Sequence, residues 1–361
     1  MIRWKRGEQS ALQVLDHSLK DLMTPVIEIP PIDWDFENDC PKKSLDDHLK
    51  NFKEQLKTSW NNDNPVFIDA HQICPDDDEL MEDGSHPLIS LFTMLKSENL
   101  NAIPVTSPSR AVNYQKAVYS IVNNYQTGCA IRLLDEDFDD IDRIIQGFLE
   151  AFNVDPTDID LIIDYRYIDP KNPVNRMTNL IVGSILAIPH INSWRTFTFV
   201  ATAFPENLSE IKTGTDGSIP RSEWMIYQQL LHKKLPRYPS FGDYIISNPE
   251  YSRLDPRKMR MSANIRYTAD NEYLIFRGYS VTTPKYGKCK QTQELCQRIV
   301  LHPKYSGVFY SYGDKYIFGC ANDTESTGNA ETWRKIGTNH HLTLAINELS
   351  NFHASLSIGS P

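Results

Sequence analysis

Short apolar runs alternate with longer amphipathic stretches over the first 250 residues of the chain. The runs are compact and rich in Val, Ile, Leu, Phe and Tyr, which is typical of strands that are covered on both faces of a sheet. They predict eight strands, at 2–5, 25–29, 64–70, 102–106, 129–134, 159–167, 196–203 and 241–247. Between them, apolar residues recur at helical spacing. These stretches predict helices at 8–15, 45–56, 87–96, 111–125, 141–152, 174–188 and 222–232.

The order of these elements favours a parallel α/β fold. Seven of the eight predicted strands are followed by a helix before the next strand begins. Eight β–α steps in about 250 residues match a (β/α)8 barrel of the TIM type. The alternative is an open, doubly wound α/β sheet, which the same alternation would also produce. We expect residues 1–250 to form the barrel-like core.

The rest of the chain has a different pattern, which predicts an antiparallel, β-rich elaboration over residues 251–335 and a closing helix and tail over 336–361. Strands are expected at 264–268, 272–277, 279–283, 308–312 and 316–320, and helices at 291–300 and 338–349. Asp270-Asn271 and Gly313-Asp314 supply turn residues between pairs of these strands.

Composition narrows the class of protein. The chain has 361 residues, of which 40% are apolar and 11% aromatic, so a mainly disordered chain is excluded. Its formal net charge of −10 excludes a globally basic nucleic-acid binder, although a local basic groove stays compatible with it. The first residues lack the apolar stretch of a secretory signal, and no run reaches the ~18 apolar residues of a membrane span. The six cysteines are scattered without a C-x-x-C pair, as expected for reduced thiols in a cytoplasmic protein.

Several common catalytic motifs do not occur in the sequence. It contains no G-x-x-x-x-G-K-[ST] loop, no G-x-G-x-x-G, no H-E-x-x-H and no G-x-S-x-G. Assignments as an ATPase, a Rossmann dehydrogenase, a zincin or an α/β-hydrolase therefore lose support.

Charged residues interrupt several of the predicted strands, toward the ends where a barrel carries its active site. An ionised group in a buried strand is costly unless it is paired or functional. The candidate catalytic carboxylates are Glu28, Asp69, Asp164 and Asp243. The candidate ligand-binding cations are Lys5, Arg132 and Arg166.

Two of these positions have clear structural alternatives. Glu28 is either a metal ligand or general acid/base, or the ion-pair partner of Lys5 or Arg132. Asp164 and Arg166 are two residues apart and therefore share one face of their strand. Arg166 either clamps a phosphate or carboxylate while Asp164 orients it, or the two side chains form a self-contained salt bridge.

The other two carboxylates lie at strand boundaries. Asp69 is two residues from His71, which suits a divalent metal but equally a capping Asp beside a surface His. Asp243 follows Gly242, so it is either a carboxylate with a flexible approach or part of a turn that starts a strand.

A late segment is also rich in residues of the kind found at functional sites. His340 is a candidate catalytic group, and Trp333, Arg334, Asn339 and His341 are candidate ligand-binding groups. The segment predicts a helix beginning near His340 that Asn339 or the preceding threonine caps, which would make a fair anion site. The alternative is a plain capping motif with a packed Trp333.

Several segments resemble the beta protein family, which is found in bacteria and in satellite phages of the P4 type. They are Trp4-Lys5-Arg6-Gly7-Glu8, Pro25-Val26-Ile27-Glu28-Ile29-Pro30-Pro31, Phe241-Gly242-Asp243-Tyr244, Ile265-Arg266-Tyr267-Thr268, Trp333-Arg334 and Gly337-Thr338-Asn339-His340-His341. The resemblance implies a component of a multi-gene anti-phage defence cassette, with the other proteins of the cassette as partners. It implies no particular reaction.

These observations lead to two expectations of function. The first is a site at the barrel mouth for a phosphorylated ligand, either a nucleotide or a nucleic-acid end, where a divalent cation such as magnesium supports phosphodiester hydrolysis. The second is a sensor or regulatory module that uses the same mouth without turnover and controls a partner toxin. Carboxylates that converge on a metal would favour the first, and charges that are already paired would favour the second.

Overall fold

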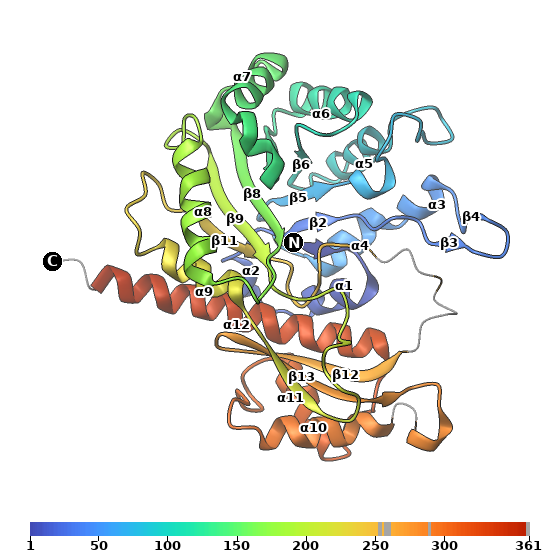
Figure 1. Cartoon of the computed structure of the whole chain (residues 1–361). Helices are drawn as coiled ribbons and strands as arrows, with labels where there is room; N and C mark the ends of the chain where they lie inside the picture. The colour runs from blue at the N-terminus through green and yellow to red at the C-terminus, as the bar shows by residue number, and fades with distance from the viewer. Residues whose placement is uncertain (252–254, 256–260, 288–289, 359–361) are drawn as a thin grey trace.

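The computed structural model describes residues 1–251, 255, 261–287 and 290–358. Within these residues the eight strands expected in the first part of the chain form one parallel sheet (Figure 1). The strands, in their order across the sheet, are β1 (Ile2–Arg3), β2 (Val26–Glu28), β5 (Val66–Asp69), β6 (Ala102–Thr106), β7 (Cys129–Leu133), β8 (Ile159–Tyr167), β9 (Thr196–Thr202) and β11 (Ser240–Asp243). The prediction of a parallel α/β sheet is confirmed.

The sheet curls so that its two edge strands approach each other. The backbone nitrogen of Met1, beside β1, donates a hydrogen bond to the carbonyl oxygen of Asp243 on β11, at 2.6 Å. Among the described residues no ladder joins β1 to β11, so the sheet is a curled half-barrel. β1 has only two residues, and the strand predicted over 241–247 ends at Asp243, shortly before Ile245 takes a left-handed φ of 60°. Because both edge strands are short, little backbone is left for hydrogen bonds between β1 and β11.

Helices between the strands cover the outer face of the sheet (Figure 1). They are α1 (Arg6–Gln13), α2 (His17–Lys20), α3 (Leu45–Leu49), α4 (Phe52–Ser59), α5 (Pro87–Lys96), α6 (Val112–Tyr125), α7 (Ile141–Phe152), α8 (Val174–Ala187) and α9 (Ser222–Leu230). The helices predicted at 87–96 and 141–152 are confirmed to the residue, and the helix predicted at 45–56 is split in two. A small hairpin of β3 (Trp34–Asp35) and β4 (Cys40–Pro41) was not predicted.

Both faces of the parallel sheet are buried, as strands of this composition require. Apolar residues of the outer face and of the helices form the main core of the molecule. A smaller apolar cluster, which includes Val26, Phe67 and Ile162, lies on the inner face.

The C-terminal part of the chain adds an antiparallel sheet with the order β10-β13-β12. Its strands are β10 (Asp216–Pro220), β12 (Ser262–Ala269) and β13 (Glu272–Ser280). The predicted hairpin with its turn at Asp270-Asn271 is confirmed, but β13 continues without a break to Ser280. The prediction lacks β10, because its side chains are exposed or half-buried and carry no apolar alternation.

The prediction of a second hairpin at 308–320 is wrong. This segment contains the helix α11 (Tyr312–Ala321), which packs against α10 (Gln291–Leu301). Ser311 is the N-cap of α11, and its hydroxyl oxygen accepts a hydrogen bond from the backbone nitrogen of Asp314 at 3.0 Å. Asp314 therefore belongs to the first turn of a helix, where a carboxylate is favourable, and not to a β-turn.

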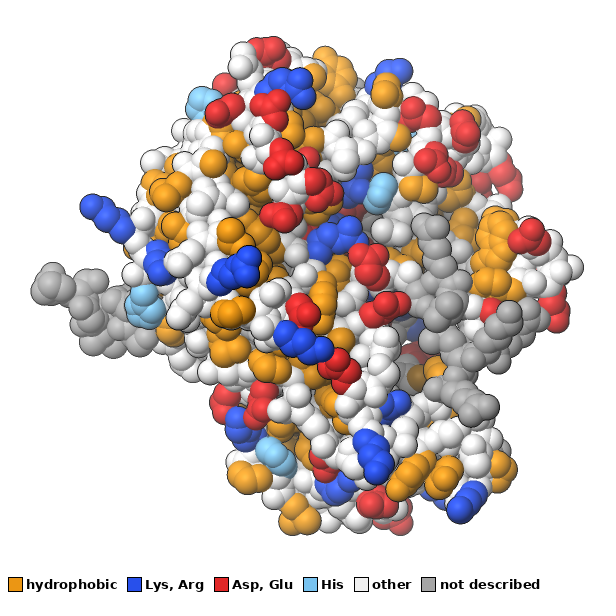
Figure 2. All heavy atoms as spheres, in the orientation of Figure 1, with side chains coloured by type: hydrophobic (Ala, Val, Ile, Leu, Met, Phe, Trp, Pro, Cys, Tyr) orange, Lys and Arg blue, Asp and Glu red, His pale blue; other side chains and the backbone are white. Residues whose placement is uncertain are grey.

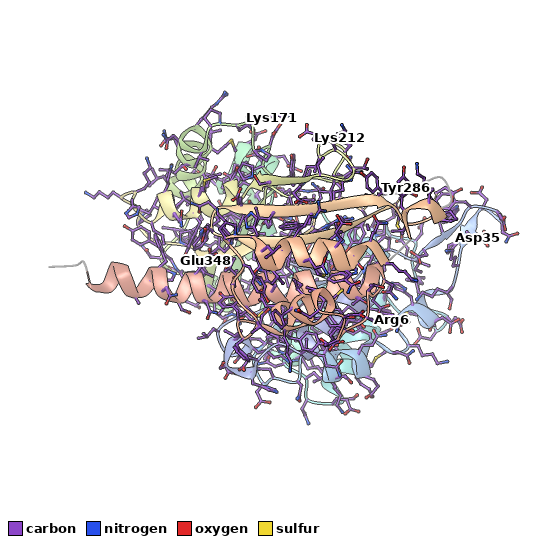
Figure 3. All side chains as sticks on the ribbon, turned by 90° about the horizontal axis from the view of Figure 1, so that it is seen from below. Arg6, Asp35, Lys171, Lys212, Tyr286 and Glu348 are labelled. Carbon is purple, nitrogen blue, oxygen red and sulfur yellow. The ribbon has the colours of Figure 1, made fainter. Side chains whose placement is uncertain are left out.

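The last helix, α12 (Ala330–Ile358), connects the two sheets. It packs against α1, β12 and α11. In Figure 3, Arg6 lies beside the beginning of α12 and Glu348 lies toward its other end. A helix was correctly predicted here, but its predicted start near His340 is wrong. Because α12 begins at Ala330, Asn339 lies inside the helix, where it caps nothing.

Candidate functional site

Arg132 on β7 is the centre of a buried cluster of charges at the carboxyl ends of the strands. Its Nη1 donates to Glu28 Oε1 and to Asp69 Oδ2, both at 2.9 Å. Its Nε donates to Asp164 Oδ2 at 2.7 Å. The three carboxylates come from β2, β5 and β8, and all four side chains are buried. The structure thus brings together four residues that the sequence singles out, with Arg132 as the partner of Glu28.

Strand geometry explains this convergence. Side chains alternate between the two faces of a strand, so residues two apart point to the same face. Val26 and Ala130 belong to the inner apolar cluster. Glu28 and Arg132 follow them by two residues, and Asp164 follows another inner residue in the same way. Because parallel neighbours end at the same edge of the sheet, these inner-face charges meet there.

Tyr244, immediately after β11, completes the cluster. Arg132 Nη2 donates to Tyr244 Oη at 2.6 Å, and the Tyr244 hydroxyl donates to Asp164 Oδ2 at 2.5 Å. Sequence reasoning missed this residue, since a tyrosine inside the strand predicted at 241–247 is most simply a core residue. The available signal was its place in the segment Phe241-Gly242-Asp243-Tyr244, which carries part of the family resemblance.

A second arginine, Arg110, binds the same carboxylate as Arg132. Its Nη2 donates to Asp69 Oδ2 at 2.9 Å. Burial alone would raise the pKa of Asp69, but the two guanidinium groups hold that pKa below its ordinary value. Arg110 lies in the loop after β6, where no periodic pattern identifies an inward-facing residue, so it was not predicted.

A polar cavity of about 120 Å³ opens over this cluster; we call it the carboxyl-end cavity. Its lining residues are Glu28, Asp69, His71, Gln72, Ser107, Ser109, Arg110, Arg132, Leu134, Arg166 and Pro249. Three buried atoms of this lining have no hydrogen-bond partner among the described residues: Glu28 Oε2, Arg110 Nε and His71 Nδ1. Burial, with a smaller effect of Arg110, lowers the pKa of His71 to about 4, so its ring is neutral at pH 7. The cavity therefore offers both donors and acceptors to a guest.

Arg166 and Lys5 lie at the rim of the cluster. Arg166 has a side chain that is 43% exposed, and it pairs with Glu250 rather than with Asp164. Asp164 Oδ1 accepts a hydrogen bond from the backbone nitrogen of Arg166 instead, at 2.8 Å, where the chain takes a left-handed φ of 52°. The Nζ atom of Lys5 lies 5.6 Å from the ring centre of Tyr251.

Asp243 and His341 form a separate pair beside the gap between β1 and β11. His341 Nε2 lies 2.8 Å from Asp243 Oδ2, and its Nδ1 lies 2.9 Å from the hydroxyl of Thr268. Burial alone would raise the pKa of Asp243, but His341 and a hydrogen bond from the backbone nitrogen of Ile245 lower it to about 2. This pair joins α12 to both sheets.

The other late candidates hold the C-terminal part of the molecule together. His340 is buried, with Nδ1 at 2.8 Å from Asp314 Oδ2 and its ring stacked at 3.9 Å on Tyr267. Asn339 Oδ1 accepts a hydrogen bond from the backbone nitrogen of Gly313 at 3.0 Å. Trp333 Nε1 donates to the carbonyl oxygen of Thr327 at 3.0 Å. None of these contacts reaches the Arg132 cluster.

A larger cavity of about 940 Å³, the amino-end cavity, lies at the opposite end of the strands. It is lined by residues near the beginnings of the strands, such as Asp160 and Arg195, and by inner-face residues such as Val26 and Ile162. The helix α12 supplies one wall, which includes His341 and Ile346.

The carboxylates do not fit a magnesium ion as they stand. Across residues 1–251, 255, 261–287 and 290–358, no three His, Cys, Asp or Glu side chains are grouped so that they could hold a metal. Glu28, Asp69 and Asp164 converge on the guanidinium of Arg132 instead. None of the helices that the structure describes has both the length and the apolar character of a membrane span.

Comparison with proteins of known families adds an assignment for nearly the whole chain. No curated protein matches the sequence. A family model described as Beta protein matches residues 1–347, so the chain belongs to the Beta protein family.

Proposed function

We propose that the protein is a cytoplasmic, ligand-binding component of an anti-phage defence cassette, and that the carboxyl-end cavity holds the phosphorylated head of its ligand. In this proposal the curled sheet acts as a (β/α)8 barrel with an incomplete seam at β1 and β11. Such barrels place their sites at the carboxyl ends of the strands. The cassette setting comes from the family resemblance.

The observation that carries the proposal is the unsatisfied polar lining of the carboxyl-end cavity. A buried polar atom without a partner costs free energy, so such atoms are rare unless a ligand or a water serves them. Arg110 Nε offers a donor and Glu28 Oε2 an acceptor, and both are buried without a partner among the described residues. A phosphate ester with a neighbouring hydroxyl supplies the matching acceptor and donor.

The size of the cavity favours a compact group. A volume of about 120 Å³ compares with roughly 30 Å³ for one water in the liquid, so the cavity has room for about four waters or one oxyanion head. The face seen in Figure 2 carries Lys, Arg, Asp and Glu side chains interspersed, without a continuous basic track. Long duplex nucleic acid would meet acidic groups on such a face.

Pairing of the charges favours binding over hydrolysis. A divalent metal needs free carboxylate oxygens, whereas each of the three carboxylates already receives a guanidinium hydrogen bond. Metal-assisted hydrolysis of a phosphodiester would require Asp69 and Asp164 to give up hydrogen bonds from Arg132 before they could join Glu28 Oε2 around a metal. A recognition site needs no such rearrangement.

Isothermal titration tests this proposal with orthophosphate, AMP and ATP at low salt. We expect saturable binding that weakens with added salt, and a loss of about tenfold or more in Arg110→Gln, because a hydrogen bond between charged groups contributes about 1.5–3 kcal/mol. Arg143→Gln is the matched control, since its side chain is 83% exposed on α7 and it removes the same charge. Equal affinity of Arg110→Gln and wild type for every anion would refute the proposal. Release of phosphate or nucleoside during the titration would instead favour a hydrolase.

A further inference from the structure

Three arginines from separate parts of the chain bind the segment that follows β11, and a lysine lies close to one of them. Arg266 on β12 donates from Nη1 to the carbonyl oxygen of Ile246 at 2.6 Å. Arg334 on α12 donates from Nη1 to Ser247 Oγ at 2.8 Å. Arg3 on β1 donates from Nη2 to the carbonyl oxygens of Asn248 and Glu250. The fourth cation is Lys5, which follows Arg3 by two residues and lies with Nζ at 5.6 Å from the ring centre of Tyr251. We call these four residues the arginine notch.

The arginine notch has too few carboxylates for its cations. Glu8 Oε1, at 3.5 Å from Arg334 Nε, is the one carboxylate that the described residues bring into contact with it. Arg266 has no carboxylate partner there and instead lies 4.6 Å above the ring of Phe204. Arg3 Nε is buried without a hydrogen-bond partner among the described residues. Removing cations from water without a counter-ion costs free energy. This excess of positive charge therefore favours the binding of an anion.

The pKa values of the notch residues are shifted in the direction expected for buried cations without a counter-ion. Burial, followed by the charge of Arg334, lowers the pKa of Arg266. Burial likewise lowers the pKa of Arg334, against the opposing charge of Glu8. A bound anion would favour the charged form of each group.

Two glycines show that the notch is closely packed. A Cβ atom at Gly7 would lie 2.6 Å from Cγ of Arg334, and a Cβ atom at Gly337 would lie 2.7 Å from Cδ1 of Ile246. A side chain at Gly7 would therefore push Arg334 away from α1, and a side chain at Gly337 would push α12 away from the segment after β11. The arginines are held in place by this packing rather than spread over the surface.

The notch adjoins the carboxyl-end cavity. Arg3 and Glu28 are direct neighbours in the register of β1 and β2, and adjacent strands lie about 4.8 Å apart. Glu250 accepts from Arg3 through its carbonyl oxygen and pairs with Arg166, a cavity residue, through its carboxylate. The notch and the cavity are therefore linked through Glu250 and through the neighbouring strands β1 and β2.

We infer that the arginine notch is a second anion subsite, so that the ligand of the carboxyl-end cavity carries at least two phosphate or other anionic groups. The inference rests on the proposed function, because it treats the cavity as the site of the first group. It defines the ligand class as polyphosphates, such as a nucleoside triphosphate or a dinucleotide, rather than a phosphate monoester. Glu250 is the group that a second phosphate displaces from Arg166.

Titration with orthophosphate and with tripolyphosphate tests the inference, with Lys5→Gln and Arg266→Gln as notch variants and Arg110→Gln as the cavity variant. Wild type should bind tripolyphosphate at least tenfold more tightly than orthophosphate. The notch variants should lose about tenfold or more in tripolyphosphate affinity and keep their orthophosphate affinity. Arg110→Gln should weaken both.

Arg6→Gln is the matched control for the notch, since Arg6 follows Lys5 directly, is 82% exposed and pairs with Glu331. Lys5→Gln changes an exposed side chain, so it keeps the test informative if Arg266→Gln does not fold. Equal affinity of wild type for the two anions, or equal losses in Arg6→Gln and Lys5→Gln, would overturn the subsite while leaving the cavity proposal intact. Losses in the notch variants without any loss in Arg110→Gln would overturn the cavity proposal, and with it the inference of a joint site.

Discussion

The two ends of the parallel sheet are built in opposite ways. At the carboxyl ends, Arg132 and three carboxylates fill the interior, and the remaining cavity is about 120 Å³. At the amino ends the cavity is about 940 Å³, and inner-face residues such as Val26 and Ile162 form part of its wall. The carboxyl end is thus charged and has a small cavity, whereas the amino end has a large cavity with a partly apolar wall.

In the proposal made above, the carboxyl end binds the ligand, and the amino end holds the two sheets together. The carboxyl end concentrates side chains whose charges are set by one another, as expected of a site that selects a ligand by charge and shape. At the amino end the wall supplied by α12 and the Asp243–His341 pair connect the two sheets. Perturbing each end should therefore have a different consequence.

The largest effect is expected from Arg132→Met. This change leaves three buried carboxylates without their common partner, and breaking a buried ion pair on one side costs about 3–5 kcal/mol. Urea unfolding at pH 7 should show a loss of this size or a failure to fold. The deficit should shrink as the pH falls, because protonation removes the uncompensated negative charge. Arg143→Met, on the exposed face of α7, should unfold like wild type, and an equally stable Arg132→Met would contradict the account of the cluster.

A smaller, pH-dependent effect is expected from Asp243→Asn. The pKa of Asp243 in the folded protein is about 2, below the ~3.9 of an unfolded chain. A depressed carboxyl pKa contributes stability that is present above about pH 4 and is lost as the pH falls toward 2. The variant should therefore be less stable than wild type by about 2 kcal/mol at pH 7, and the difference should fall to a few tenths of a kcal/mol near pH 2. A difference that does not change with pH would show that the Asp243–His341 pair is not the cause.

The sequence identified the charged residues on the inner face of the sheet, but not all of the residues that bind to them. Glu28, Arg132 and Asp164 were recognisable because each interrupts an apolar strand with period two, which identifies both the position and the face. Arg110 and Tyr244 lie outside the strands, in segments whose direction depends on tertiary packing. The hydrogen bond between His340 and Asp314 was missed for a similar reason. It joins α12 to α11, and the turn-like residue Gly313 made α11 look like a hairpin in the sequence.

The smallest effects compare the packed interior of the sheet with the wall of the amino-end cavity. Ala130 lies on β7 among the inner apolar residues and is fully buried, whereas Ala345 on α12 lines the amino-end cavity. Ala130→Leu should cost about 1 kcal/mol or more through overpacking. Ala345→Leu should change the free energy of unfolding by less than about 0.5 kcal/mol, because the added atoms enter existing space. Equal costs in thermal unfolding would show that the wall of the amino-end cavity is as tightly packed as the interior of the sheet.

The most direct test of the central claim is a crystal structure of the protein soaked with tripolyphosphate. The account predicts phosphate density in the carboxyl-end cavity, with an oxygen within about 3.2 Å of the Arg110 guanidinium and further density toward Arg3 and Lys5. Density confined to the amino-end cavity, or an unchanged carboxyl-end cavity at a concentration that saturates binding in solution, would contradict it.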